Sequence, residues 1–323
     1  MIETRQVLQI IVMFMIVQFF GLLLASMLFS GATYQEVRSA QAVSSITGLL
    51  FYIVYIIVVA AALMLILRIY RGNKLFILIE GGVLFITAFF VFLIFSGEFI
   101  SSTLFTVFGT GITVNFIIGI FAALALVIAK NRWPFLRNTA AIIASVGVGV
   151  VLGVSFGFVV SLIFMAIIAV YDFVAVFVTK HMVVMAKAMS SRNLAFLIGV
   201  DEIEAVSKSE FTSREVMEFN KETKGKLKGI IRKMYNQGML PISARVELGT
   251  GDLAIPLMVA VSAYSVNLNF TLSFFIIGGS IFGLILTTFI LRRYKRALPA
   301  IPPLLFGVLL GIATYIIAFG IRI

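Results

Sequence analysis

The chain contains a series of apolar stretches that are each long enough to cross a lipid bilayer. A helix rises about 1.5 Å per residue, so about 20 apolar residues span the hydrocarbon core. Backbone amides and carbonyls cannot stay unpaired in lipid, and continuous stretches of this length therefore predict helices. Of the 323 residues, 61% are hydrophobic and only 12% are charged, which is not the composition of a soluble domain. We predict an all-α, polytopic membrane protein.

Nine membrane-spanning helices account for these stretches. The region 138–179 is about two bilayer thicknesses long as a helix, so it must turn, and Gly153–Gly157 is the expected place. The predicted spans are 6–29, 46–67, 75–95, 102–129, 138–154, 157–179, 247–266, 270–291 and 299–320. They divide the chain into six spans at 1–179, a cytoplasmic loop at 180–246 and three spans at 247–323.

The distribution of lysine and arginine predicts the orientation of these spans. The short loops after the second, fourth and eighth spans are basic, whereas the odd-numbered loops together carry only Arg38. The basic residues of these three short loops are Arg68, Arg71, Lys74, Lys130, Arg132, Arg137, Arg292, Arg293, Lys295 and Arg296, and the long loop after the sixth span is basic as well. Basic loops stay in the cytoplasm, so the N-terminus is predicted to be cytoplasmic and the C-terminus to lie outside the cell membrane. This orientation explains the net charge of +11, which therefore gives no reason to predict a nucleic-acid partner.

The loop at 180–246 contains the pattern of a basic amphipathic helix. Thr212 and Glu215 have the spacing of a capping box, and apolar residues then recur at helical spacing until Gly238. The opposite face is rich in lysine, which is typical of a helix that lies on an anionic membrane surface. Membrane lipid is the partner expected for this helix, and a substrate or protein site is the alternative.

Two aspartates interrupt the apolar spans near the predicted cytoplasmic face. Asp172 lies eight residues before Lys180, and Asp252 lies seven residues after Arg245, which places both roughly 10–12 Å below the surface. A carboxylate at this depth costs a few kcal/mol and marks a candidate functional site. Two carboxylates that share one proton can activate water, as in aspartic proteases. The alternative is a channel or transporter in which the pair coordinates a proton or a cation.

Other kinds of chemistry have little support in this sequence. The chain has no cysteine and a single histidine, His181, so thiolate metal sites and H-E-x-x-H zinc sites are excluded, and we predict neither metal nor cofactor. Gly153-Val-Ser155-Phe-Gly157 matches an esterase pattern, but no histidine lies near it in the chain. Its glycines, together with Gly149, have the four-residue spacing that lets helices pack closely.

Glu80 is a third acidic residue near membrane depth. It follows Lys74 by six residues, and its side chain is expected to reach the cytoplasmic interface. A functional partnership with the two aspartates is the alternative.

Three short elements occur in order along the second half of the chain. They are Tyr171-Asp172, Gly249-Thr250-Gly251-Asp252, and Leu298-Pro299-Ala300-Ile301-Pro302 just before the last span. Together they resemble the presenilin and signal peptide peptidase family over about residues 130 to 320, and the chain is most similar to the archaeal presenilin homologues. One departure is Ile301, where the family has leucine. The predicted orientation agrees with presenilin, whereas the signal peptide peptidase branch is inverted.

The resemblance implies cleavage of peptide bonds within transmembrane helices of substrate proteins. Asp172 and Asp252 would carry the catalysis without a cofactor. The other residues that the resemblance assigns to the motifs and to the substrate-contacting wall of the site are Tyr171, Gly249, Thr250, Gly251, Pro299, Ala300 and Ile301. Presenilin works within a complex and signal peptide peptidase does not need those subunits, so accessory subunits and oligomeric state stay open.

Overall fold

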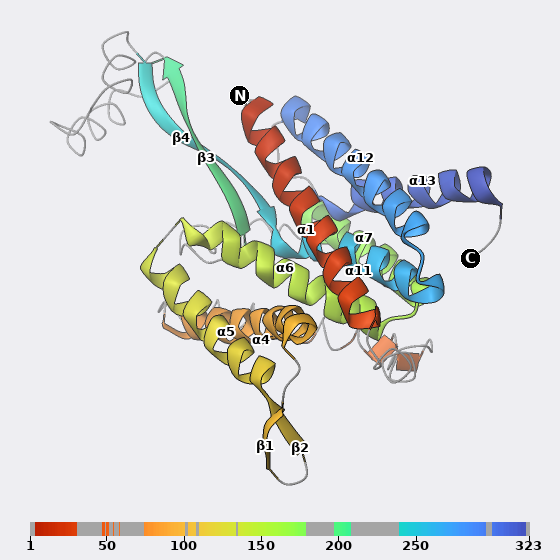
Figure 1. The fold of residues 1–323 in the computed structure, drawn as a ribbon. Helices are drawn as coiled ribbons and strands as arrows, with labels where there is room; N and C mark the ends of the chain where they lie inside the picture. The colour runs from red at the N-terminus through yellow and green to blue at the C-terminus, as the bar shows by residue number, and fades with distance from the viewer. Residues whose placement is uncertain are drawn as a thin grey trace, which may run out of the picture. The chain divides into compact units, whose positions relative to one another are not determined.

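A computed structural model describes most of the membrane-embedded part of the chain. The described residues are 4–30, 47–48, 50–51, 54, 58, 74–100, 103–107, 110–133, 135–178, 197–207, 239–294 and 299–320. The chain divides into two compact units, and Figure 1 shows its helices and strands. The smaller unit combines Met1–Gln9 with Gly199–Glu247, and the larger one combines Ile10–Ile198 with Leu248–Ile323.

Helices dominate the larger unit, as the apolar stretches predict. Within the described residues, seven helices are long and apolar enough to cross a membrane, and an eighth, α11, is shorter. The helices are α1 (Thr4–Ser30), α4 (Lys74–Phe99), α5 (Val114–Arg132), α6 (Leu136–Ser155), α7 (Phe158–Phe173) with the π-helical turn η1 (Val174–Val178), α11 (Thr250–Asn267), α12 (Phe270–Tyr294) and α13 (Ile301–Phe319). The predicted span 46–67 lies almost entirely outside the described residues.

One predicted span begins in the wrong place. Instead of a helix from residue 102, strands β1 (Thr103–Val107) and β2 (Thr110–Thr113) pair antiparallel, and α5 starts only at Val114. This stretch is rich in β-branched threonine, which suits strands better than helices. Its overall hydrophobicity hid that difference, because hydropathy does not distinguish an apolar strand from a helix.

The loop at 180–246 contains strands that the sequence analysis did not predict. β3 (Leu197–Ser207) and β4 (Met239–Gly249) pair in a two-stranded sheet, and the last residues of β4 lead directly into α11. The predicted span 247–266 therefore starts at Thr250. The predicted amphipathic helix and His181 lie outside the described residues.

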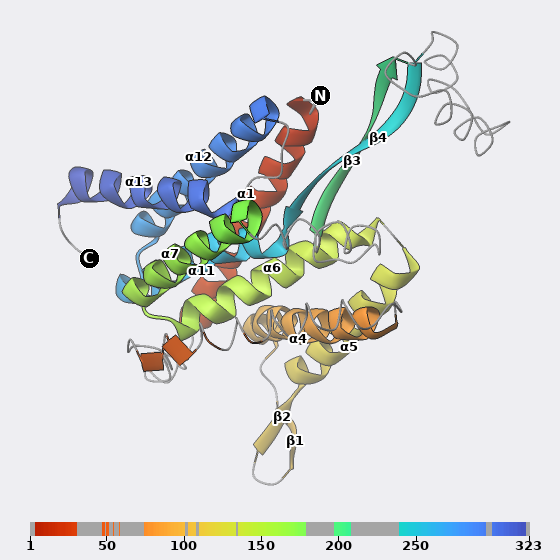
Figure 2. The same ribbon diagram turned by 180° about the vertical axis from the view of Figure 1, so that it is seen from behind.

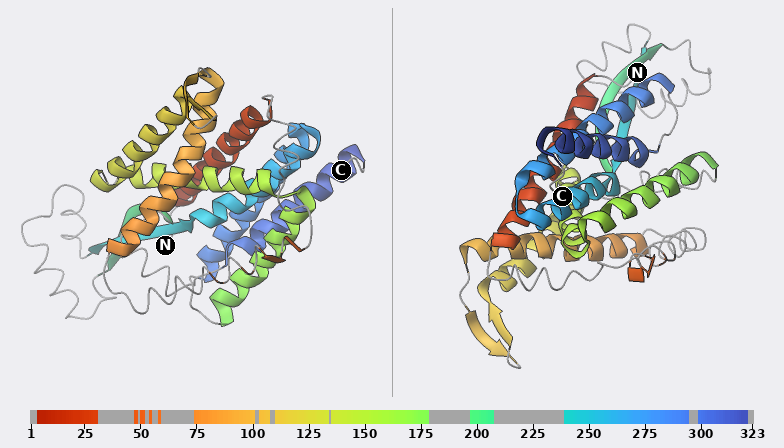
Figure 3. Two further views of the ribbon diagram at one scale, coloured as in Figure 1. Left: turned by 90° about the horizontal axis from the view of Figure 1, so that it is seen from below. Right: turned by 90° about the vertical axis from the view of Figure 1, so that its right-hand side faces the viewer.

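Helix α11 is the most deeply buried helix of the larger unit. Its residues from Leu253 to Ser265 are all buried, and it packs against α6, α7 and α12 (Figures 1 and 2). The part of α1 within this unit also contacts it, since Gln18 donates a hydrogen bond to the Leu253 carbonyl at 3.0 Å. Helices α4 and α5 lie side by side, and α4 packs against α6 (Figure 3).

Two of the predicted packing glycines hold α6 against α11. A Cβ atom on Gly153 would lie 2.6 Å from Cβ of Val261 and 2.8 Å from the Met258 carbonyl oxygen, and one on Gly149 would be similarly crowded. The prediction of close packing is therefore confirmed for these two. It is wrong for Gly157, where an added Cβ would meet nothing within 4 Å.

Alanine at position 153 is expected to destabilise the protein, because the Met258 carbonyl belongs to the α11 backbone and cannot move alone. Overpacking of this kind costs about 1–3 kcal/mol. We expect Gly153→Ala to lower the free energy of unfolding by this amount, measured by denaturant titration in mixed micelles. Gly82→Ala on α4 is the matched control, since a Cβ there meets nothing within 4 Å. Equal stability of the two variants would contradict the close packing of α6 on α11.

Candidate active site

Asp172 lies at the point where α7 changes its helical form. It is the penultimate residue of α7, and the next five residues, Val174–Val178, form a π-helical turn. Such turns are rare and occur often at functional sites. The residue is only 2% exposed, although the neighbouring Tyr171 is 37% exposed. A carboxylate at this depth needs polar partners from other helices.

Asp252 lies in the first turn of α11, and the glycines before it explain how the turn forms. Gly249 is the N-cap residue in an extended conformation and has no side chain that could cap the helix. The Asp252 carboxylate reaches back to the Gly249 backbone amide, as the third helical residue does in a capping box. A Cβ atom on Gly249 would lie 3.2 Å from Oδ2 of Asp252, so any larger residue would crowd the carboxylate.

A buried hydrogen bond between serines fixes how α7 and α11 align. The hydroxyls of Ser161 on α7 and Ser262 on α11 lie 2.7 Å apart. Asp172 is eleven residues after the first serine, about 16 Å along the helix, and Asp252 is ten residues before the second, about 15 Å. The helices are antiparallel, so both steps lead to the same level. There the two carboxylates are close enough for their charges to repel each other.

The third element, at the start of α13, also reaches this level. Pro299 is buried, and the helix begins at Ile301 with Ala300 as its N-cap. The Ile301 amide donates a hydrogen bond to Oδ2 of Asp172 at 3.2 Å. The structure thus brings together residues that are 129 positions apart in the chain, and all three sequence elements meet at one site.

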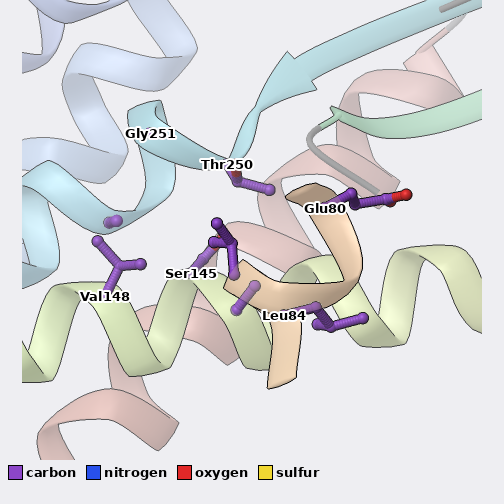
Figure 4. A pocket seen from close by; sticks show the side chains of 9 residues that line it. Glu80, Leu84, Ser145, Val148, Thr250 and Gly251 are labelled. Atoms are coloured by element: carbon purple, nitrogen blue, oxygen red, sulfur yellow. The ribbon is translucent and has the colours of Figure 1, made fainter. Parts of the chain in front are cut away.

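Thr250 and Gly251 face away from this meeting point. They line a cavity of about 140 Å³ between α4, α6 and α11, together with Glu80, Leu84, Ser145 and Val148 (Figure 4). On a helix of 100° per residue, the face shared by Thr250, Gly251 and Ala254 is roughly opposite Asp252. These motif residues therefore shape the turn that carries the aspartate.

Glu80 does not extend to an exposed interface, which corrects the expectation for this residue. It is 2% exposed and forms an ion pair with Lys130 of α5. Lys130, which was predicted to follow the fourth span, lies within α5, because this helix continues to Arg132, and Lys130 is 8% exposed. Hydropathy counts could not reveal this pair, because they depend on single spans and not on which spans are neighbours.

Sequence reasoning also missed the polar side chains that brace the site. Gln18 and the serine pair at 161 and 262 are all buried within apolar helices. The sequence did indicate these contacts, because a polar side chain within an apolar span needs a hydrogen-bond partner. Among the described residues, no group of three or more histidine, cysteine or carboxylate side chains could hold a metal ion.

Comparison with known proteins shows which family this chain belongs to. Residues 11–321 match the family model for "Signal-peptide peptidase, presenilin aspartyl protease". Two solved structures of a presenilin family intramembrane aspartate protease, in space groups C222 and P2, are similar in fold, with TM-scores of 0.58 and 0.59. Each is 20% identical in sequence, and the matches cover 95% of this chain and 95% and 96% of the other chains. No curated protein was found to match in sequence. Because the family model covers almost the whole chain, the protein belongs to the signal peptide peptidase and presenilin family of aspartyl proteases.

Proposed function

We propose that this protein hydrolyses peptide bonds within transmembrane helices and that Asp172 and Asp252 are its catalytic pair. The observation that carries the proposal is the level alignment of the two carboxylates on adjacent antiparallel helices, which rests on the serine pair and on their mutual electrostatic interaction. Two such carboxylates cannot both be ionised at low cost, so one proton shared between them is the expected resting state.

The chemistry follows from that shared proton. The ionised carboxylate takes a proton from water, and the water oxygen forms a bond to the carbonyl carbon of the substrate. The carbonyl π electrons move to its oxygen, which takes the proton of the second carboxyl group, and a tetrahedral diol results. When the C–N bond breaks, the leaving nitrogen receives the proton that the first carboxylate took from water. One diol hydroxyl gives its proton to the second carboxylate, and the substrate carbonyl forms again as a carboxylic acid. Atoms and charges balance, and the pair regains its single proton.

The start of α13 is the proposed contact for the unwound part of the substrate. Irregular backbone at membrane depth is tolerated where it is buried in protein or lines a wet cavity. Pro299 is buried and Ala300 is partly exposed, and the partly exposed Tyr171 precedes Asp172 in the chain. These residues are proposed to form the wall against which a substrate helix opens.

We further propose nine crossings, with the loop 180–246 and the N-terminus in the cytoplasm. Support comes from the packing of the glycines: Gly149 meets Ala254 and Leu257, and Gly153 meets Met258 and Val261, so α6 and α11 run in the same direction. The intervening α7 runs opposite to α11, as alternating crossings require.

The orientation is testable because the chain has no cysteine. Single variants Arg38→Cys and Arg292→Cys in intact cells are expected to differ in labelling by an impermeant maleimide. Position 38 is predicted to be labelled from outside and position 292 only after permeabilisation, because basic loops remain in the cytoplasm. The reverse pattern would overturn the proposed orientation without affecting the proposed chemistry.

The function itself is tested by incubating the purified protein in detergent with a reporter transmembrane helix and analysing the products by mass spectrometry. We expect fragments cut within the apolar segment. Membership of an aspartyl protease family does not support the alternative of a channel or transporter, and the assay separates the two, because a transporter leaves the reporter intact. An intact reporter in the presence of folded protein would count against the protease.

A further inference from the structure

The first turn of α13 has few backbone N–H groups that still need an acceptor. Pro302 and Pro303 occupy its early positions and carry no N–H. The Leu304 amide bonds within the turn to the Ala300 carbonyl at 3.3 Å, and Ala300 offers no side-chain cap. The amides that remain at this helix end are therefore those of Ala300 and Ile301.

One of these amides is bound to Asp172. The Ile301 amide donates a hydrogen bond to Oδ2 at 3.2 Å, and the Ala300 amide lies near the same carboxylate. Asp172 thus occupies the place of an N-cap side chain for α13, although it comes from α7. Aspartate is a favoured acceptor at this position, and the helix dipole attracts its negative charge.

Helix α12 holds this end of α13 in place. A Cβ atom on Gly283 would lie 2.5 Å from the Pro303 carbonyl oxygen and 2.8 Å from Cα of Leu304, so the two backbones are in close contact. The Ile301 side chain is itself 4% exposed. The donor is therefore fixed by packing on several sides, and its direction does not depend on the carboxylate that it contacts.

We propose that the backbone amide of Ile301 is a positioning group for catalysis, which holds Oδ2 of Asp172 and leaves Oδ1 as the oxygen that exchanges a proton with water. This inference rests on the proposed function. The donated N–H occupies one lone pair of Oδ2 and stabilises its negative charge, so Oδ1 is the more basic oxygen and the two oxygens of one carboxylate acquire different tasks. The isoleucine at this position is tolerated because the backbone, and not the side chain, makes the contact.

The test removes the amide hydrogen while monitoring both kcat and KM with the reporter helix. Ile301→Pro lacks the N–H and suits the first helical position, whereas Ile301→Ala keeps the N–H and loses most of the side chain. A second form of the test exchanges the amide at 301 for a backbone ester that keeps the isoleucine side chain. Hydrogen bonds to charged groups are strong, so we expect kcat to fall about tenfold or more in the proline and ester variants with KM unchanged.

The outcomes separate this proposal from the proposed function. The ester variant is decisive where Ile301→Pro does not fold, which thermal unfolding in detergent reveals. A folded ester variant with the kcat of the wild type overturns the positioning role, as does an Ile301→Ala variant that loses as much kcat as the ester. Asp172→Asn is measured in parallel. If it remains active, the catalytic pair itself is wrong; if it is inactive while the ester variant is fully active, only the role of the Ile301 amide fails.

Discussion

Asparagine in place of either Asp172 or Asp252 is expected to lower kcat for cleavage of a transmembrane reporter by about 10³-fold or more. An amide can neither take the proton of water nor return one to the leaving nitrogen, and acid–base groups each contribute about 10²–10⁴-fold. Because the carboxylates act as a pair, the double variant should be no worse than either single one.

The matched control for these variants is Glu98→Gln, the same chemical change at an exposed acid near the end of α4. It should leave kcat unchanged. The inactive variants should also remain folded, since asparagine is close to aspartate in size and its side-chain oxygen can accept the same backbone N–H bonds. Fragments that persist in both single variants would show that another protein produces them and would remove the support for the pair.

Loss of Lys130 is expected to have the largest effect on stability. Its partner Glu80 is 2% exposed, so Lys130→Met would remove a counter-charge from a carboxylate in the protein interior. Removal of one member of a buried ion pair costs about 3–5 kcal/mol, whereas replacement of both by uncharged groups is often nearly neutral. We therefore expect Lys130→Met to lower the free energy of unfolding by about 3 kcal/mol or more and the Glu80→Gln/Lys130→Met double variant to recover most of it.

Activity measured on the same variants decides the role of Glu80. Its side chain lines the cavity beneath Thr250 and Gly251, so it lies near the turn that carries Asp252. If the pair is structural, activity should follow stability, and the double variant should cleave the reporter. A stable Glu80→Gln variant that does not turn over substrate would instead make Glu80 part of the catalytic machinery. Equal stability of Lys130→Met and the wild type would contradict the buried pair.

The sequence allowed the levels of the two aspartates along their helices to be estimated, but it did not predict which residues surround them. Depth follows from counting residues to the nearest basic loop, and this placed Asp172 and Asp252 at similar levels. Lateral neighbours depend on packing between spans, so the contacts of Asp172 with Ile301 and of Glu80 with Lys130 could not be derived from periodicity. The hairpin before α5 was missed for a related reason, because hydrophobicity alone does not distinguish its strands from a helix.

The site also depends on the number of residues between each aspartate and the serine contact. The hydrogen bond between Ser161 and Ser262 fixes α7 against α11, so this number determines where each carboxylate lies. One residue added or lost between Ser161 and Asp172 would turn the carboxylate by about 100° around α7 and direct it away from its partner. Substitutions within this interval leave the count intact. We therefore expect the length of this interval to be constant in related chains, whereas the identities of its exposed residues can vary. The spacing between Ser161 and Asp172, and not a motif within it, is what the position of this carboxylate requires.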